Sequence, residues 1–384
     1  MELTREQFTE SLENFLLEKD GFLNLTKLVA EIIMGAEREL FKEEHSDVSN
    51  GYRPRRLITN GGIIELQVPR TRRHNFMPVI LGIIKSQNEE MVHIASHLYR
   101  CGNTLEYISG VFEILYGKSY STSQINRLTL SSKEAVEEWR IRPLLPSYEA
   151  IMIDATYLSV RRGDQVSKEA FFCVMGLRAD GSREMLGVYN NPTEGSGIWC
   201  EFFQDLKTRG VENVGLIISD GLNGIENVAQ EHFPGVEVQL CTVHLKREIE
   251  KKLRPKDKAE ILGKIKEIFD PHNPQLTYQG AIEAFREFAD EKQKSYPFLS
   301  KIANGSRASF YFTFFKYETT VRKYIHSTNW IERFNRNVKK GAYYKCSFTS
   351  VESALFLVGS IASHATYLKR KISDLKRGLH KILK

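Results

Sequence analysis

The chain has 384 residues, of which 41% are hydrophobic and 27% charged, and its net charge is +6. This length and composition predict a globular protein of two or three domains, and they exclude a fibrous or largely disordered chain. The longest charge-free apolar stretch, between Glu352 and Lys369, has 16 residues. Because a membrane helix needs roughly 20, we expect no membrane partner.

The cysteines and the N-terminus indicate the compartment. Five cysteines, an odd number, are scattered along the chain, which is typical of a reducing cytoplasm. The first residues, MELTREQFTESLENF, lack the basic-then-apolar pattern of a signal peptide. We therefore expect a cytoplasmic protein.

The positive charge is concentrated in two regions. Between Ser49 and Gln87, six arginines and one lysine stand against one glutamate, and between Arg322 and Lys384, fourteen basic residues stand against three acidic ones. The rest of the chain is acidic. Two basic regions on an acidic protein are typical of surfaces that bind a polyanion. Chance clustering on a solvated surface is the alternative.

Residues 1–45 have helical periodicity, and a basic segment follows them. The stretch NGYRPRRLITNGGIIELQVPRTRR alternates apolar and polar residues on both sides of Asn60, Gly61 and Gly62, which predicts a hairpin. A basic ribbon can follow a nucleic-acid backbone, although a structural hairpin with a charged rim fits the pattern as well. The arginines that flank the two strands are Arg53, Arg55, Arg56, Arg70, Arg72 and Arg73.

Residues 89–140 return to helical periodicity. TLEYISGVFEILYG followed by KSYSTSQINRLTLSS predicts a helix, a turn at Gly117 and a second helix that starts near Ser121. This is the outline of a helix-turn-helix, with Ser123, Gln124 and Arg127 as groove-facing candidates. Any pair of antiparallel helices gives a similar pattern.

The middle of the chain predicts an α/β sheet. Three successive strands are expected at 150–160, 170–178 and 182–190, and a helix near 197–209 follows. Further on, a strand, a helix and a strand are expected at 214–219, from about 222 and at 236–240. The sheet would therefore begin with three antiparallel strands. From 242 to about 290 the periodicity is helical.

Two acidic residues belong to these strands. Asp154 lies in an apolar strand between Ile153 and Ala155, and a buried carboxylate costs several kcal/mol unless it is paired or binds a metal. Asp220 ends the strand VGLIIS, at the sheet edge where open α/β folds place their sites. Together they predict a Mg²⁺ or Mn²⁺ site. An arginine paired with Asp154 and a simple turn at Asp220 are the alternatives.

Glu332 is the one acidic residue in STNWIERFNRNVKK, among the bases Arg333, Arg336, Lys339 and Lys340. It could close a capping box with Asn329. It could instead be a third metal ligand while its basic neighbours bind phosphates. Three carboxylates suit two-metal phosphoryl transfer. In that reaction the metal activates water or a 3′ hydroxyl, so the protein needs no nucleophilic side chain of its own. No Ser-His-Asp, P-loop or Rossmann signature is present, so no nucleotide cofactor is expected.

Cys241 and His244 form a C-x-x-H pair in LCTVHLKREI. No second pair of similar spacing accompanies them, so the sequence does not favour zinc. They could be a core cysteine with a histidine at a helix start, or the wall of an active site close to Asp220.

Four segments, IDATY, ISDGLNGI, CTVHLKRE and STNWIERFNRNVKKG, resemble in order the mutator-type transposases of bacterial insertion sequences. The upstream hairpin and helices also match, so the resemblance covers most of residues 45–350. It implies a DDE transposase with a ribonuclease-H-like core, a mixed α/β sheet interrupted by an all-helical insertion. Asp154, Asp220 and Glu332 would be the catalytic triad and hold two Mg²⁺ ions, which Mn²⁺ could replace. Cys241, His244 and Asn335 would be their neighbours.

The resemblance also implies an organisation and a set of partners. Residues 1–45 would be an N-terminal helical segment, 46–145 a DNA-binding region, 146–241 and 326–384 the core with its basic tail, and 242–325 the insertion. The partners would be double-stranded DNA, both the inverted repeats that end the element and the target, and a second copy of the chain when two ends are joined. The site of action would be the nucleoid of a bacterial cytoplasm.

The DNA-binding candidates, taken from the basic hairpin, the helix-turn-helix outline and the bases around Glu332, are the six hairpin arginines, Gln124, Arg127, Arg333, Arg336, Lys339 and Lys340. Two departures from the family pattern are a missing tryptophan near Ser306–Phe314 and Trp330 in place of a smaller residue. A nuclease that only hydrolyses DNA, and a non-catalytic repressor derived from a transposase, are the competing hypotheses.

Overall fold

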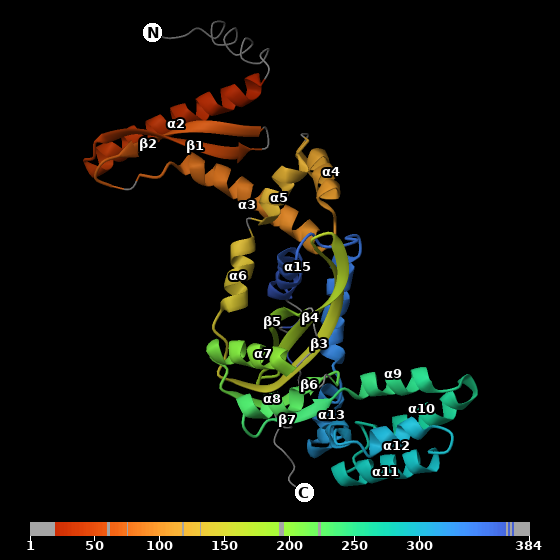
Figure 1. The fold of residues 1–384 in the computed structure, drawn as a ribbon. Helices are drawn as coiled ribbons and strands as arrows, with labels where there is room; N and C mark the ends of the chain where they lie inside the picture. Colours follow the sequence, from red (N-terminus) through yellow and green to blue (C-terminus); the bar gives the residue numbers. More distant parts are fainter. Residues whose placement is uncertain are drawn as a thin grey trace, which may run out of the picture. The chain divides into compact units, whose positions relative to one another are not determined.

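The structure is a computed structural model that describes residues 20–59, 62–74, 76–116, 119–130, 132–191, 196–221, 224–365, 368 and 371. The chain divides into two compact units, 1–132 and 133–384 (Figure 1). In the described part, no helix is both long and apolar enough to cross a membrane. The expected helix before residue 20 lies outside these residues.

The first unit begins with a helix on a hairpin. Helix α2 (Gly21–His45) is followed by β1 (Ser49–Thr59) and β2 (Gly62–Thr71), which pair antiparallel. The predicted hairpin is therefore confirmed, while Asn60 and Gly61 of its turn lie outside the described residues. Helix α2 lies along the hairpin (Figure 1), and its apolar side packs on β2 through a core of Ala30, Met34, Ile64, Leu66, Val68 and Leu81.

Three helices complete the first unit. They are α3 (Val79–Arg100), α4 (Leu105–Tyr116) and α5 (Thr122–Leu130). They share a core that includes Met91, Ala95, Ile108, Phe112, Tyr120, Ile125 and Leu128. The two predicted helices are present as α4 and α5, and the glycine expected in their turn lies outside the described residues.

The second unit contains the predicted sheet. Its five strands lie in the order β5 (Arg183–Asn191), β4 (Gln165–Leu177), β3 (Ser147–Arg162), β6 (Asn213–Ser219) and β7 (Glu237–Leu240). Strands β3, β4 and β5 pair antiparallel, whereas β3, β6 and β7 run parallel. The prediction of a mixed α/β sheet that starts with three antiparallel strands is confirmed.

Helices cover both faces of this sheet. Ile151 and Ile153 of β3 belong to a large core with α7 (Ser196–Thr208) and α8 (Ile225–His232). On the opposite face, α14 (Asn329–Ala342) packs on β3 and β4. Two further helices pack against β5, and they are α6 (Lys133–Ile141) and α15 (Val351–Ser363). Because side chains alternate along a strand, Asp154 faces α14.

Between β7 and α14 the described chain has helices and no strand. They are α9 (Thr242–Lys252), η1 (Pro255–Asp257), α10 (Lys258–Ile268), α11 (Tyr278–Glu291), α12 (Pro297–Ala303), η2 (Ala308–Tyr311), η3 (Thr313–Lys316) and α13 (Thr319–Ile325). The rings of Phe269, Phe285 and Phe312 pack together among them. The buried Gln239 of β7 ties these helices to the sheet, because its side chain accepts from Phe314 N at 2.7 Å and donates to Tyr311 O at 3.0 Å.

Candidate active site

The register of the parallel strands brings Asp154 and Asp220 together. Met152 of β3 lies opposite Ile218 of β6. Two residues further on, and therefore on the same face, stand Asp154 and Asp220. One carboxylate oxygen of each, and a ring nitrogen of His244, lie within 4.8 Å of one another. This group stands at the carboxyl end of β6, as the strand pattern predicts.

Asp154 is buried, with 5% of its surface exposed. Its Oδ2 accepts a hydrogen bond of 2.8 Å from Nδ2 of Asn335 on α14. Burial, followed by the nearby Asp220 carboxylate, raises the pKa of Asp154 to about 7, against the opposing effects of His244 and Asn335. The alternative in which an arginine neutralises Asp154 is wrong, because an amide is its partner among the described residues.

The raised pKa of Asp154 predicts a pH-dependent stability when metal is removed. Its pKa is about 3.9 in an unfolded chain, so between roughly pH 4 and 7 only the folded state keeps the proton. Asp154 should therefore make the free energy of unfolding fall with rising pH by about 1.4 kcal/mol per unit, or roughly 2 kcal/mol from about pH 5 to 6.5. His326, whose burial lowers its pKa to about 4, acts in the opposite direction over this range in both proteins. The prediction is therefore a difference in slope between the wild type and Asp154→Asn, measured by urea denaturation in EDTA. Equal slopes for the two proteins would contradict it.

The start of α9 is fixed between the sheet and α14. The backbone N–H of Cys241, which precedes α9, donates to Ser219 O at 2.7 Å, next to Asp220. The backbone N–H and the hydroxyl of Thr328, which precedes α14, both donate to Cys241 Sγ at 3.4 Å. The thiol therefore joins the two helix starts that carry His244 and Glu332.

His244 is half-buried between two groups of candidate ligands. Its interaction with Cys241 raises the pKa of His244 to about 9, and the carboxylates of Asp154 and Asp220 contribute to the shift. Burial opposes ionisation of the Cys241 thiol, but the neighbouring His244 and the hydrogen bonds from Thr328 lower its pKa overall. Of the two hypotheses for the C-x-x-H pair, the structure supports the one that places it in the wall of the site.

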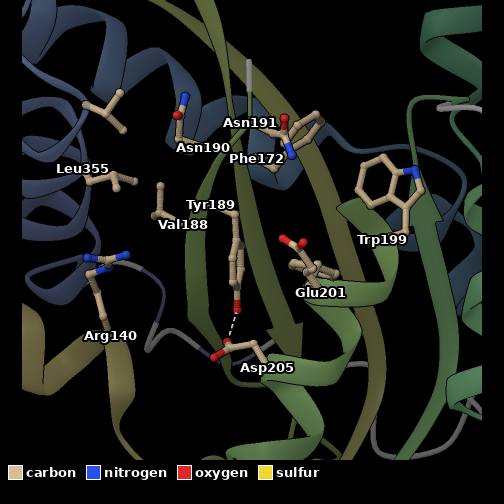
Figure 2. A pocket seen from close by; sticks show the side chains of 12 residues that line it. Arg140, Phe172, Val188, Tyr189, Asn190, Asn191, Trp199, Glu201, Asp205 and Leu355 are labelled. Atoms are coloured by element: carbon tan, nitrogen blue, oxygen red, sulfur yellow. Dashed lines mark hydrogen bonds between the residues drawn. The ribbon is translucent and has the colours of Figure 1, made fainter. Parts of the chain in front are cut away.

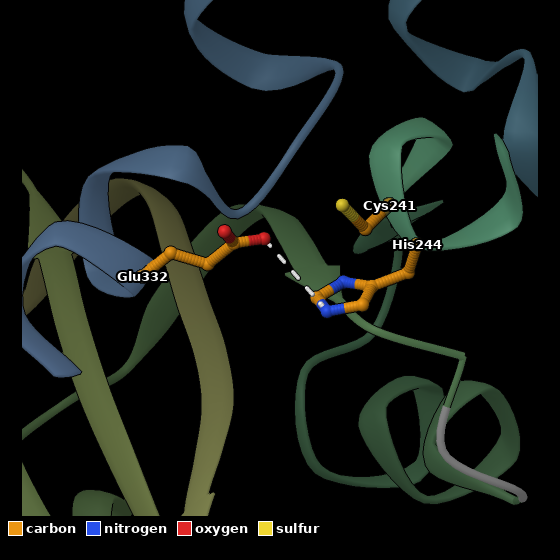
Figure 3. A group of neighbouring side chains, drawn as sticks. All are labelled: Cys241, His244 and Glu332. Atoms are coloured by element: carbon orange, nitrogen blue, oxygen red, sulfur yellow. Dashed lines mark ion pairs between the residues drawn. The ribbon is translucent and has the colours of Figure 1, made fainter. Parts of the chain in front are cut away.

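Glu332 lies in the first turn of α14 and points toward α9 (Figure 3). It forms a second candidate group with His244 and Cys241, in which the ligand atoms lie within 4.8 Å. Both oxygens of its carboxylate accept from Arg247 of α9, Oε1 from Nη1 and Oε2 from Nη2, each at 3.1 Å. Its Oε1 is also 3.7 Å from Nε2 of His244.

The capping-box interpretation of Glu332 is wrong. The residue that caps α14 is Thr328, its side chain makes no capping hydrogen bond, and the Glu332 carboxylate is held by Arg247 instead. The rest of the helix is amphipathic. Ile331, Phe334 and Val338 are buried, and the exposed side carries Arg333, Arg336, Lys339 and Lys340.

The loop after Asp220 is held by an arginine that the sequence does not single out. Arg307, which precedes η2, donates from Nη1 to the carbonyl of Gly221 at 2.9 Å. Its Nε donates to the carboxylate of Glu226, a buried residue of α8. The helical segment therefore supports the residue that follows Asp220. The unexpected Trp330 packs under the guanidinium of Arg183, which lies 3.8 Å from its ring centre.

The DNA-binding candidates of the first unit lie on its surface. Arg53, Arg55 and Arg56 on β1, Arg70 on β2, and Arg72 and Arg73 after it are exposed. Arg56 pairs with Glu65 across the hairpin at 3.1 Å. Arg127 of α5 is also exposed, whereas Gln124 caps α5, since its Oε1 accepts from Ser121 N at 2.8 Å and its own N–H donates to Ser121 Oγ at 3.2 Å.

A separate cavity of about 420 Å³ lies between β4, β5, α6, α7 and α15 (Figure 2). Its lining includes Arg140, Trp199 and Tyr189, whose hydroxyl donates to Asp205 at 2.5 Å. None of the predicted site residues lines this cavity. The candidate active site is therefore the acidic cluster and not this hollow.

The donor set of the acidic cluster fits a divalent cation. Two carboxylates converge at the sheet edge, and burial together with the charge of Asp220 raises the pKa of Asp154 to about 7, so a cation bound between them would offset an unfavourable charge. Carboxylate oxygens are the ligands that hard divalent cations prefer. Asp154 and Asp220 would hold such an ion, with His244 and Glu332 next to them.

Comparisons with known proteins identify the family and several relatives of this chain. The family model described as "Transposase, Mutator family" matches residues 7–369. The transposase for insertion sequence element IS905 of Lactococcus lactis is 29% identical over 90% of both chains. The transposase for ISRM3 of Rhizobium meliloti is 29% identical over 90% of this chain and 88% of its own. The transposase for IS256 in transposon Tn4001 of Staphylococcus aureus is 29% identical over 86% and 84%.

A solved structure, the Drosophila P element transposase strand transfer complex, is similar with a TM-score of 0.32 and 11% identity, over 80% of this chain and 84% of that one. This likeness is too weak to support an inference. The family model, in contrast, matches nearly the whole sequence. The chain therefore belongs to the Mutator family of transposases.

Proposed function

We propose that this protein is a DDE-type DNA transposase. It cleaves DNA at the inverted repeats that end its insertion sequence and transfers the freed 3′ end to target DNA. Asp154, Asp220 and Glu332 are its metal-binding catalytic residues. The observation that carries the proposal is the convergence of Asp154 and Asp220 at the end of β6. His244 lies close to both aspartates and is also 3.7 Å from Glu332, so all three acids gather around it.

The topology supports a ribonuclease-H-like core. The first acid lies in the central strand β3, the second follows the neighbouring parallel strand β6, and the third lies on the late helix α14. Helices α9 to α13 separate the second acid from the third, which is where an all-helical insertion is expected. This arrangement agrees with the fold that the sequence resemblance implies.

The chain's own residues prepare the site for metal and DNA. Two Mg²⁺ ions, when bound, supply activation of water or a 3′ hydroxyl and stabilisation of the leaving oxygen. Asp154 and Asp220 bind them, and Asn335 orients Asp154 by donating to its Oδ2. Packing of α14 on β3 keeps bulk water from Asp154, which strengthens its interaction with a cation.

Exposed bases supply the contacts to double-stranded DNA. On α14, Arg333 is the residue after Glu332 and Arg336 lies one helical turn beyond Glu332, so both can bind phosphates that flank the reacting one. The hairpin arginines of the first unit form a second basic surface, which fits the expected DNA-binding region 46–145. A second copy of the chain would bind the other end of the element.

Alanine at Arg55, Arg56 or Arg72 should weaken binding to every duplex sequence. Each loses one phosphate contact, which lowers the slope of log affinity against log salt by about one. The variant at Arg56 should lose the least affinity for DNA, because the guanidinium of Arg56 is already paired with the carboxylate of Glu65. Fluorescence anisotropy over roughly 50 to 200 mM salt measures the slope. The control is Glu65→Gln, which frees Arg56 and should strengthen binding; weaker binding by this variant would argue against a DNA-contacting hairpin.

One experiment tests the function without knowledge of the DNA ends. Purified protein is incubated with Mg²⁺ and a supercoiled plasmid that carries this gene and its native flanks, and new nicks and junctions are mapped by sequencing. Breaks at paired inverted repeats, with joined products, would support a transposase. Nicks without joining would indicate a nuclease, and DNA binding without breaks a repressor.

A further inference from the structure

Arg247 and Glu332 form an ion pair at the edge of the candidate metal site. We propose that Arg247 is a displaceable counter-ion of Glu332, which competes with the metal for this carboxylate and, once displaced, binds a phosphate of the DNA. The inference rests on the proposed function, since it takes Glu332 as a metal ligand. The inference makes Arg247 a residue that contacts the DNA. It also explains why the site would stay inactive until a metal binds, because Arg247 holds Glu332 until then.

The first support is the geometry of the pair. The two Nη atoms of Arg247 each donate to one oxygen of Glu332 at 3.1 Å. This two-point contact is the arrangement that a guanidinium makes equally well with a carboxylate or with a phosphate. It engages one lone pair on each oxygen of Glu332 and fixes the orientation of the carboxylate, so a metal has to compete with the guanidinium for this charge.

The second support is where the carboxylate is held. His244 and Arg247 are three residues apart on α9 and therefore share one side of the helix. The close groups of ligand atoms place Glu332 with His244 and Cys241, and place the two aspartates with His244. Glu332 is therefore next to the aspartate pair but is not part of its group. To share an ion with the aspartates, it has to move away from Arg247.

The third support is the balance of charge. The guanidinium of Arg247 is a permanent positive charge on Glu332, in the same region as the carboxylates of Asp154 and Asp220. A divalent cation bound by these acids would place more positive charge beside the guanidinium, and like charges repel. Arg247 is free to move away, because its side chain is 52% exposed. A displaced guanidinium at this edge would meet the phosphates of a bound strand.

The ordinary alternative is a salt bridge that only joins α9 to α14. The two interpretations predict opposite changes in metal affinity when Arg247 is removed. A competitor of the metal, when removed, leaves the metal more tightly bound. A structural brace, when removed, leaves Glu332 less well placed and the metal equally or more weakly bound.

The test measures Mn²⁺ binding to the full-length chain without DNA, from the free-ion signal in electron paramagnetic resonance. Arg247→Gln should bind Mn²⁺ roughly two- to fivefold more tightly than the wild type. This factor corresponds to the free energy that a partly exposed ion pair contributes. Arg247→Lys keeps the charge but loses the two-point contact, and should fall between them. Lys251→Gln removes the same charge one helical turn away and should match the wild type.

Each outcome decides between the two interpretations. Unchanged or weaker Mn²⁺ binding by Arg247→Gln overturns the proposal, and so does equal tightening by Lys251→Gln, which would indicate a general charge effect. If Arg247→Gln does not fold, Arg247→Lys decides, because it too should bind more tightly than the wild type. Asp154→Asn separates failure of the proposed metal site from failure of the proposed role of Arg247. If this variant bound Mn²⁺ as tightly as the wild type does, the metal site itself would be refuted.

The phosphate contact has its own measurement. With a duplex from the native flanks, the salt slope of binding should be lower by about one for Arg247→Gln than for the wild type in Ca²⁺, where Arg247 has been displaced. In EDTA the two slopes should agree, because Glu332 still holds the guanidinium. Equal slopes in Ca²⁺ would refute the phosphate contact.

Discussion

Asp154→Asn, Asp220→Asn and Glu332→Gln should each abolish DNA cleavage and leave DNA binding nearly unchanged. Stabilisation of the reacting phosphate by metal contributes several kcal/mol, and 1.36 kcal/mol is a factor of ten, so the rate should fall roughly a thousandfold or more. Binding is retained because the exposed bases of the hairpin and of α14 remain in place.

The asparagine variant of Asp154 is expected to fold. Its amide oxygen can still accept the hydrogen bond that Asn335 donates to Asp154, and the cost of burying a charge is removed. A loss of cleavage therefore reports on the carboxylate and not on the fold. The matched control is Glu149→Gln, which changes another acid of β3 away from the cluster.

The assay is nicking of the supercoiled plasmid in Mg²⁺, with binding of the same DNA measured in Ca²⁺. Loss of binding in all three variants would mean that the acids are structural. Cleavage that survives in one variant would remove that residue from the triad. Slow cleavage by Glu149→Gln would mean that β3 tolerates no neutral substitution, and the result for Asp154 would then say little about metal.

The sheet could be predicted because its signals are local. Each strand of the second unit contains an apolar run bounded by polar or turn residues, and burial of such runs on both faces gives a parallel or mixed sheet. Strand β3 extends from 147 to 162, beyond the expected 150–160, because it pairs with β4 along its polar end as well. Asp154 and Asp220 could be found since each interrupts or ends an apolar run.

The contacts that set the state of the site were not predictable in this way. Arg247 reaches Glu332 across 85 residues, and Arg307 reaches Gly221 across 86. Nothing in the local sequence distinguishes these two arginines from their neighbours. The same limit explains the error over the capping box, where a fitting local spacing lost to a tertiary ion pair that uses both oxygens of Glu332.

The second large effect is expected at Arg307. Arg307→Met should lower the free energy of unfolding by about 3 kcal/mol, because it leaves the Glu226 carboxylate, whose side chain is 7% exposed, without its cationic partner. It should also slow cleavage tenfold or more, roughly the effect of a small misplacement at a reacting centre. The reason is that the carbonyl of Gly221, next to Asp220, loses the donor that fixes it.

A double variant separates these two effects. Glu226→Gln combined with Arg307→Met removes the buried charge together with its partner, so most of the stability should return. Cleavage should stay slow, since the Gly221 carbonyl still has no arginine. Urea denaturation and plasmid nicking are measured on the same preparations.

Lys316→Met provides the matched control for Arg307. Lys316 belongs to the same helical segment and pairs with Glu237 of β7 at 3.0 Å, away from Asp220. It should lose some stability and keep the wild-type rate. If the double variant regained cleavage along with stability, Arg307 would act through the fold alone. If cleavage stays slow in a stable protein, the helical segment positions Asp220, and its contact with the sheet is then part of the active site.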